Sequence, residues 1–151
     1  MGINKSTVYN WIKKLDEKIQ NTDCTEENSV AEEKTTEIIE MDELFDYIKG
    51  KNRTYVITLV TRKPRQIVGF DVAYDKSEER IQKIVDSSIK VKHYYSDANP
   101  SYQDVSYFGE HFYFRDKSHT FTVEGINSDI RKYIAALQRR SNMLFSLVRD
   151  F

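Results

Sequence analysis

The sequence of 151 residues has little cysteine and no long apolar run. A single cysteine, Cys24, excludes an intramolecular disulfide and a zinc site built from cysteines. The longest apolar stretches are far too short for a membrane span, and the N-terminus lacks the apolar core of a signal peptide. We therefore expect a cytoplasmic protein without a membrane partner, in which Cys24 is a free thiol in a polar segment.

An excess of charge of one sign is also missing. The 23 lysines and arginines balance 24 aspartates and glutamates, which gives a formal net charge of -1. A global electrostatic attraction to nucleic acid is therefore excluded, and any binding to nucleic acid must depend on local clusters. The length suits one compact domain with a small appendage.

The chain divides into three zones. Residues 1–20 are predicted to form one helix, because their apolar residues recur at helical spacing: Val8, Ile12, Leu15 and Ile19. Residues 21–37 are polar and acidic and have almost no large apolar side chain, which is typical of a flexible linker. Residues 38–151 contain the strand and helix patterns of the main domain.

The main domain is predicted to be a mixed α/β fold. Its strands are expected at residues 38–48, 53–61, 66–74, 91–97 and 111–114, and its longer helices at residues 77–89 and 119–142. A short helix is expected between the last two strands. A turn at Lys63-Pro64-Arg65 makes the second and third strands antiparallel, and a helical crossover makes the fourth strand parallel to one of the first three.

Three acidic residues are candidates for metal-assisted phosphoryl transfer, which needs divalent ions held by convergent carboxylates. Asp42 lies within the first strand, Asp97 directly follows the fourth, and Glu124 begins the last helix. Each has an ordinary alternative. Asp42 could belong to a solvated strand face, Asp97 could form a turn, and Glu124 could be favoured by the helix dipole alone.

The joint placement of these acids is more informative than any one of them. A ribonuclease-H-like fold gathers its metal-binding acids on the first strand, at the end of the fourth strand and on a later helix, and this fold analogy is a hypothesis. The helical wheel puts Glu124, Ser128 and Arg131 on one face, opposite the predicted buried face. Three neighbouring acids compete with Asp42 for the first ligand position: Glu40, Glu43 and Asp46.

Four segments resemble the transposases of the insertion-sequence-one family, within the DDE superfamily. They are EMDELFDYI, QIVGFDV, YYSDANPSY and HTFTVEGINSDIRKYIAALQRRSNMLFS, and the resemblance extends from about Glu37 to the end of the chain. The last segment is the most specific, because it has a histidine, then acid-x-x-asparagine, then LR-like and RR-[ST] elements in the family's order. The resemblance implies a ribonuclease-H-like catalytic domain, a mixed five-stranded sheet flanked by helices, over residues 38–151.

The resemblance also implies roles for individual residues. Asp42, Asp97 and Glu124 match the catalytic triad of acids, which would bind two Mg²⁺ ions, with Mn²⁺ as an alternative. His119 and Asn127 match supporting positions of the family. The arginines of the last helix are candidates for contacts with DNA phosphates, with a merely solvated charge as the alternative: Arg131, Arg139 and Arg140.

The N-terminal segment GINKSTVYNWIKKL resembles the second helix of a helix-turn-helix. Its candidate DNA-binding residues lie off the apolar stripe: Lys5, Thr7, Asn10 and Lys14. The alternative is an ordinary amphipathic helix. Because this segment begins inside the expected turn, we expect only a partial helix-turn-helix, and we also expect the catalytic domain to be shortened at its C-terminus.

The resemblance implies a transposase that cleaves DNA and transfers strands at the ends of an insertion element. Its partners would be double-stranded DNA, as element ends and target, and further copies of the chain in a homodimer or larger synaptic complex. Its place would be the nucleoid of a prokaryotic cytoplasm. Two alternatives stay open: a decayed or domesticated DNA-binding remnant of such a transposase, and a ribonuclease-H-like nuclease without strand transfer.

Overall fold

The computed structural model describes residues 5–23, 37–48, 52–116 and 118–133. Arg139 and Arg140 lie outside the described residues, as do most of the expected linker and the predicted last helix beyond residue 133.

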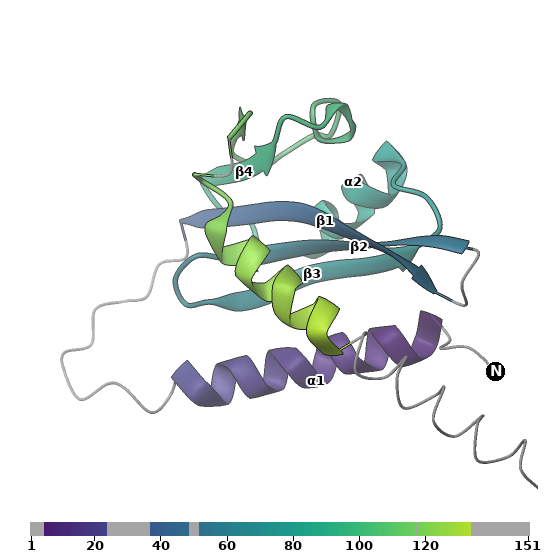
Figure 1. The fold of residues 1–151 in the computed structure, drawn as a ribbon. Helices are drawn as coiled ribbons and strands as arrows, with labels where there is room; N and C mark the ends of the chain where they lie inside the picture. Colours follow the sequence, from purple (N-terminus) through teal and green to yellow (C-terminus); the bar gives the residue numbers. More distant parts are fainter. Residues whose placement is uncertain (1–4, 24–36, 49–51, 117, 134–151) are drawn as a thin grey trace, which may run out of the picture.

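A five-stranded sheet forms the centre of the molecule (Figure 1). Its strands are β1 (Ile38–Ile48), β2 (Asn52–Thr61), β3 (Gln66–Ala73), β4 (His93–Asp97) and β5 (Glu110–Phe114). They lie in the order β3-β2-β1-β4-β5. The first three strands pair antiparallel, whereas β4 is parallel to β1 and β5 is parallel to β4. This order and these directions are those of a ribonuclease-H-like fold, so the predicted fold class is confirmed.

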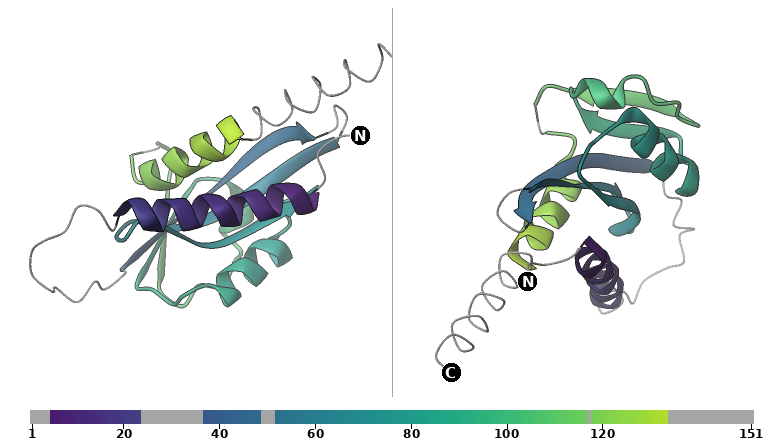
Figure 2. Two further views of the ribbon diagram at one scale, coloured as in Figure 1. Left: turned by 90° about the horizontal axis from the view of Figure 1, so that it is seen from below. Right: turned by 90° about the vertical axis from the view of Figure 1, so that its right-hand side faces the viewer.

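Helices cover both faces of the sheet. α1 (Lys5–Asp23) and the last helix (residues 121–133) lie on one face, and α2 (Glu78–Ser87) lies on the other (Figures 1 and 2). A single turn of 3-10 helix, η1 (Pro100–Tyr102), follows β4 and packs near α2. The inner strand β2 is therefore buried on both faces, which agrees with its β-branched and aromatic composition.

Two hydrophobic cores result, one on each side of the sheet. The first joins α1, the last helix and strands β1, β2 and β3, and its helical members are Val8, Ile12, Leu15, Val123, Ile126 and Ile130. The second joins α2 to the opposite face through Ile81, Ile84 and Val85. The apolar stripe predicted for the N-terminal helix is therefore buried against the sheet, and its polar side is the part left for other contacts.

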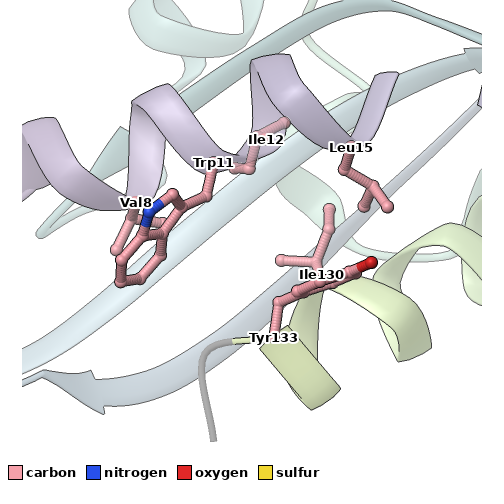
Figure 3. A pocket seen from close by; sticks show the side chains of 6 residues that line it. All are labelled: Val8, Trp11, Ile12, Leu15, Ile130 and Tyr133. Atoms are coloured by element: carbon pink, nitrogen blue, oxygen red, sulfur yellow. The ribbon is translucent and has the colours of Figure 1, made fainter. Parts of the chain in front are cut away.

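An apolar pocket lies between α1 and the last helix (Figure 3). Trp11 lies beside Val8 on α1 and Tyr133 beside Ile130 on the last helix, and the full lining is Val8, Trp11, Ile12, Leu15, Ile130 and Tyr133. The two helices thus meet through aromatic and aliphatic side chains, and they position the last helix over the sheet. Among the helices that the structure describes, none combines the length and the apolar character that crossing a membrane requires.

Candidate metal centre

The parallel pairing of β1 and β4 brings Asp42 close to Asp97. The register pairs Met41 with Ser96, so the two aspartates are the next residues along the two strands. Carboxylate oxygens of Asp42, Asp97 and Glu43 all lie within 4.8 Å of one another. We call these three residues the carboxylate cluster. Two of the three acids predicted from the sequence are thus neighbours in the fold.

The end of β4 explains how Glu43 joins the cluster. Neighbouring residues of a strand point to opposite faces of the sheet, so Asp42 and Glu43 leave β1 on different sides. β4 ends at Asp97, whereas β1 continues to Ile48 paired only with β2. The sheet therefore has a free edge at this point, around which side chains from both faces can converge on Asp97.

Asn127 connects the last helix to the carboxylate cluster. Its Nδ2 donates a hydrogen bond to Oδ2 of Asp42 at 3.0 Å, and its Oδ1 accepts one from Oγ1 of Thr58 at 3.0 Å. Asn127 is 6% exposed, so its amide is held between β2 and the cluster. The structure thus brings one of the predicted supporting residues into direct contact with Asp42.

Glu124 lies one turn before Asn127 on the last helix and is half-buried. Its backbone N–H donates to the carbonyl of Thr120 at 3.1 Å, as expected in the first turn of a helix. Among the described residues, the group of carboxylates within 4.8 Å of one another is the cluster defined above, and Glu124 is not one of its members. The role of Glu124 as a third metal ligand stays a prediction.

Glu43 holds the turn that follows Asp97. Its carboxylate accepts hydrogen bonds from Lys76 Nζ at 2.6 Å, from Tyr102 Oη at 2.7 Å and from the side-chain amide of Asn99. The backbone N–H of Asn99 donates in turn to Oδ1 of Asp97 at 3.1 Å. The three contacts on Glu43 therefore fix the position of Asp97 as well. The sequence indicated only a turn at Asp-Ala-Asn-Pro, because the partners of this turn are distant in the chain.

Tyr102 is a permanent donor in this network. Burial raises its pKa well above the ordinary value of 10.0, and the negative charge of Glu43 adds to the shift. The phenol therefore stays protonated at neutral pH and donates to the Glu43 carboxylate.

The electrostatics of the carboxylate cluster favour a bound cation. The pKa of the Asp42 carboxyl is raised from 3.8 to about 6. Burial is the largest cause, and the charges of Glu43 and Asp97 act in the same direction, whereas the hydrogen bond from Asn127 lowers the pKa. A divalent cation would compensate this repulsion, and carboxylate oxygens are ligands that Mg²⁺ prefers. The residues present are therefore compatible with a divalent cation.

Glu40, one of the alternatives to Asp42, has a different position. Its fully buried carboxylate accepts hydrogen bonds from the backbone N–H groups of Thr122 and Val123, at 2.7 and 3.0 Å, and from Oγ1 of Thr122 at 2.9 Å. Arg62 Nε donates to it at 2.7 Å. Glu40 thus binds the N-terminus of the last helix, where a negative charge is favoured. The side chain of Asp46, a further alternative, lies outside the described residues.

His119 packs among aromatic rings before the last helix. Its ring stacks on Phe114 with centroids 4.0 Å apart and meets Tyr95 edge-on at 5.7 Å. Its backbone carbonyl accepts a hydrogen bond from Arg62 Nη2 at 2.9 Å. The supporting role that the family resemblance implies for His119 stays a prediction.

The predicted DNA-binding residues lie on helix surfaces. Asn10 and Lys14 are exposed on α1, Thr7 is half-buried there, and Lys5 is the first residue of the helix. Arg131 is exposed on the last helix. Contacts of these side chains with DNA stay predictions.

Comparison with protein-family models gave no match, and comparison with curated proteins gave none either. A comparison of folds matched a chain in the cryo-EM structure of the simian T-cell lymphotropic virus intasome in complex with the PP2A regulatory subunit B56 gamma. The TM-score is 0.56 at 12% sequence identity, and the match covers 67% of this chain and 40% of that chain. At this identity the likeness concerns the fold.

Proposed function

We propose that this chain is a DDE-type transposase that cleaves DNA at the ends of an insertion element and transfers the freed strand. The observation that carries the proposal is the meeting of Asp42 and Asp97 at the free edge between β1 and β4 in a ribonuclease-H-like sheet. The fold likeness to a chain of an intasome structure supports DNA as the class of substrate. The family resemblance of the four sequence segments supports strand transfer in addition to cleavage.

Asp42 and Asp97 would hold Mg²⁺, with Glu124 as the third acid supplied by the last helix. The chemistry that magnesium supplies in such a site is activation of an attacking water or 3′-hydroxyl and stabilisation of the leaving oxygen. Asn127 orients the Asp42 carboxylate, and Glu43 holds the turn that carries Asp97. These two contacts pre-organise the aspartates, so little rearrangement is needed when the metal and DNA bind.

Metal-dependent nicking of DNA tests this proposal. The full chain is incubated with supercoiled DNA and Mg²⁺, and with the same DNA in EDTA. We expect nicked product only with Mg²⁺, and loss of this product in Asp97→Ala with retained DNA binding. Asp104→Ala is the matched control, because Asp104 is an exposed acid on the segment that follows η1.

The products distinguish the proposed function from its closest alternative. Joined strands, recovered as DNA linked to a new site, support transposition. Nicked DNA without joined products supports a ribonuclease-H-like nuclease without strand transfer. Equal cleavage by Asp97→Ala and the unchanged chain would contradict the assignment of the carboxylate cluster to catalysis.

A further inference from the structure

The face of β4 and β5 beside the last helix is not part of the core on that side. The described core residues under α1 and the last helix come from these helices and from β1, β2 and β3, and none of them comes from β4 or β5. β5 is also the edge strand of the sheet. This part of the sheet therefore presents its side chains to the surroundings instead of packing them beneath a described helix.

Aromatic rings occupy this uncovered part. Tyr95 on β4 lies 5.7 Å from Phe112 and 5.6 Å from Phe114, both on β5, measured between ring centroids. His119 stacks on Phe114, and Phe121 lies at the start of the last helix. Phe112 and Phe121 are 39% and 58% exposed. We call the following group the aromatic face: Tyr95, Phe112, Phe114, His119, Phe121 and Arg62.

A guanidinium group lies between the rings. The central carbon of Arg62 is 5.2 Å from the ring centre of Tyr95 and 4.9 Å from that of Phe121. The ion pair with Glu40 fixes this arginine in place. Flat rings beside a fixed cation match a nucleotide, which offers a base for stacking and a phosphate for the positive charge.

The aromatic face is continuous with the carboxylate cluster. In the pairing of β4 with β5, Asp97 is the register partner of Phe114, and Tyr95 is the partner of Phe112. Residues two apart on a strand lie roughly 7 Å apart on the same face. A strand whose phosphate reaches Asp97 would therefore pass its neighbouring bases over the rings. This continuity favours a nucleic-acid strand over a protein partner.

We propose that the aromatic face binds unpaired bases of the DNA strand that enters the carboxylate cluster. This inference rests on the proposed function for the identity of the nucleic acid. Phe112 and Phe121 would stack with the bases. Tyr95 contacts Phe112 and is itself packed against Phe114 and His119, while Arg62 lies beside Phe121. The substrate class is thereby sharpened to DNA whose bases are unpaired next to the cleaved bond, such as a frayed or melted end.

Binding to strands with and without bases tests the inference. Fluorescence anisotropy in EDTA compares a labelled single-stranded oligonucleotide with an abasic strand of equal length and equal charge. For the unchanged chain we expect at least about 10-fold tighter binding to the strand with bases, because stacking on aromatic side chains contributes strongly for each base. In Phe112→Leu/Phe121→Leu the ratio should approach one, while affinity for the abasic strand stays unchanged.

Tyr74→Leu is the matched control, because Tyr74 is 62% exposed beyond the end of β3, at the opposite edge of the sheet. It should keep the ratio of the unchanged chain. The double variant changes only exposed rings, and a thermal melt verifies that it is folded. An unchanged ratio in the double variant would overturn the inference, as would a ratio near one in the unchanged chain. Sedimentation that shows loss of self-association instead of loss of base-dependent binding would assign the face to a second copy and overturn it as well.

The use of EDTA separates this inference from the proposed function. Magnesium-dependent nicking with a binding ratio near one would leave the proposed function standing and reject the aromatic face as a base-binding site. A high ratio that the double variant abolishes, without any metal-dependent nicking, would support the aromatic face and reject the proposed catalysis.

Discussion

At the scale of single residues, Asp42 is held in a place that disfavours its charge. It is half-buried, and two further carboxylates lie within 4.8 Å of it in the carboxylate cluster. Asn127 supplies a compensating hydrogen bond, and the backbone of Glu43 supplies another. Such an arrangement disfavours the charged form of Asp42 in a chain without metal, and a bound cation would relieve the repulsion. The effect of the Asp42 charge on the free energy of unfolding can therefore be measured without an assay of catalysis.

Asp42→Asn should stabilise the metal-free protein at neutral pH. The pKa of Asp42 in the folded chain is about 6, above the ordinary value of 3.8, so the folded state binds the proton more tightly than the unfolded state does. The stability of the unchanged chain should thus fall as pH rises between these two values. Above them, Asp42→Asn should be more stable by about 2 kcal/mol, a figure reduced for partial exposure. Asparagine keeps an oxygen that accepts the bond from Asn127.

Urea unfolding in EDTA at about pH 4 and at about pH 8 measures this difference. We expect the gain from Asp42→Asn to be present at the higher pH and largely absent at the lower one. Asp104→Asn changes an exposed acid, so its free energy of unfolding should stay within about 0.5 kcal/mol of that of the unchanged chain at both pH values. If Asp42→Asn is no more stable than the unchanged chain at the higher pH, the electrostatic account of the cluster is wrong.

At the scale of elements, the position of the last helix depends on its N-terminus. Glu40 binds two backbone N–H groups of the first turn, and Arg62 links Glu40 to the carbonyl of His119. Downstream on the same helix, Asn127 contacts Asp42. A buried acid of β1 therefore sets the position of the helix whose Asn127 contacts the carboxylate cluster. Glu40 thus positions a helix, whereas the role proposed for Asp42, on the same strand, is metal binding.

Removal of the Glu40 side chain should destabilise the fold strongly. Glu40→Ala leaves Arg62 without its carboxylate and the first helical N–H groups without an acceptor, so we expect a loss of about 3–5 kcal/mol in urea unfolding. Glu40→Gln keeps the shape and one acceptor oxygen, and it should cost less. Hydrogen exchange should become faster in residues 121–133 before it does in the sheet.

Glu78→Ala provides the matched control for Glu40→Ala. Glu78 is also an acid in the first turn of a helix, α2, but its side chain is exposed. Its loss should cost no more than about 1 kcal/mol, because solvent screens the interaction with the helix dipole. Equal effects of the two substitutions would contradict the anchoring role of Glu40.

At the scale of the whole molecule, two cores pack against the faces of a sheet and leave open the edge that carries the carboxylate cluster. The cores lie on the two faces, under α1 and the last helix on one side and under α2 on the other. The carboxylate cluster lies where β4 ends, at the carboxyl end of a parallel strand pair, which is the usual position of sites in α/β sheets. Since the net charge is -1, attraction of a cation arises from this local cluster and not from the chain as a whole.

Binding of a divalent cation should stabilise the whole domain. A ligand that binds only the folded chain adds about 1.4 kcal/mol at a concentration ten times its dissociation constant, which for this size raises Tm by roughly 3–6 °C. We expect this rise with Mg²⁺ or Mn²⁺ in thermal melts, and its loss in Asp42→Asn and in Asp97→Asn. Asp104→Asn should keep the rise. The same rise in all four proteins would place the bound cation elsewhere.

Much of the fold follows from local patterns, and the structure confirms those parts. β1 has the predicted bounds, β2 and β3 differ from theirs by one residue, and the short helix between the last two strands is present as η1. Alternation and β-branched residues specify these elements locally. The N-terminal helix is described from Lys5 to Asp23, three residues beyond its predicted end at Gln20, because the last residue of a helix is only weakly specified by local sequence.

The site was predictable only in part. The helical crossover implied only that the fourth strand is parallel to one of the first three, and the placement of Asp42 beside Asp97 came from the fold analogy; the structure pairs β4 with β1. The partners of Glu43 could not be predicted, since Lys76, Asn99 and Tyr102 lie between 33 and 59 positions away in the chain. Hydrogen bonds between such distant residues leave no periodic signal in the sequence.

The sequence by itself determined the order of the elements, their buried sides and the presence of several acids on β1, because periodicity and composition are local properties. Only the tertiary structure decided what each acid does. Glu40 binds the start of the last helix, Asp42 meets Asp97 and Asn127, and Glu43 holds the turn after β4. These differences arise from burial and from partners brought together by packing, neither of which is encoded in the immediate neighbours of an acid.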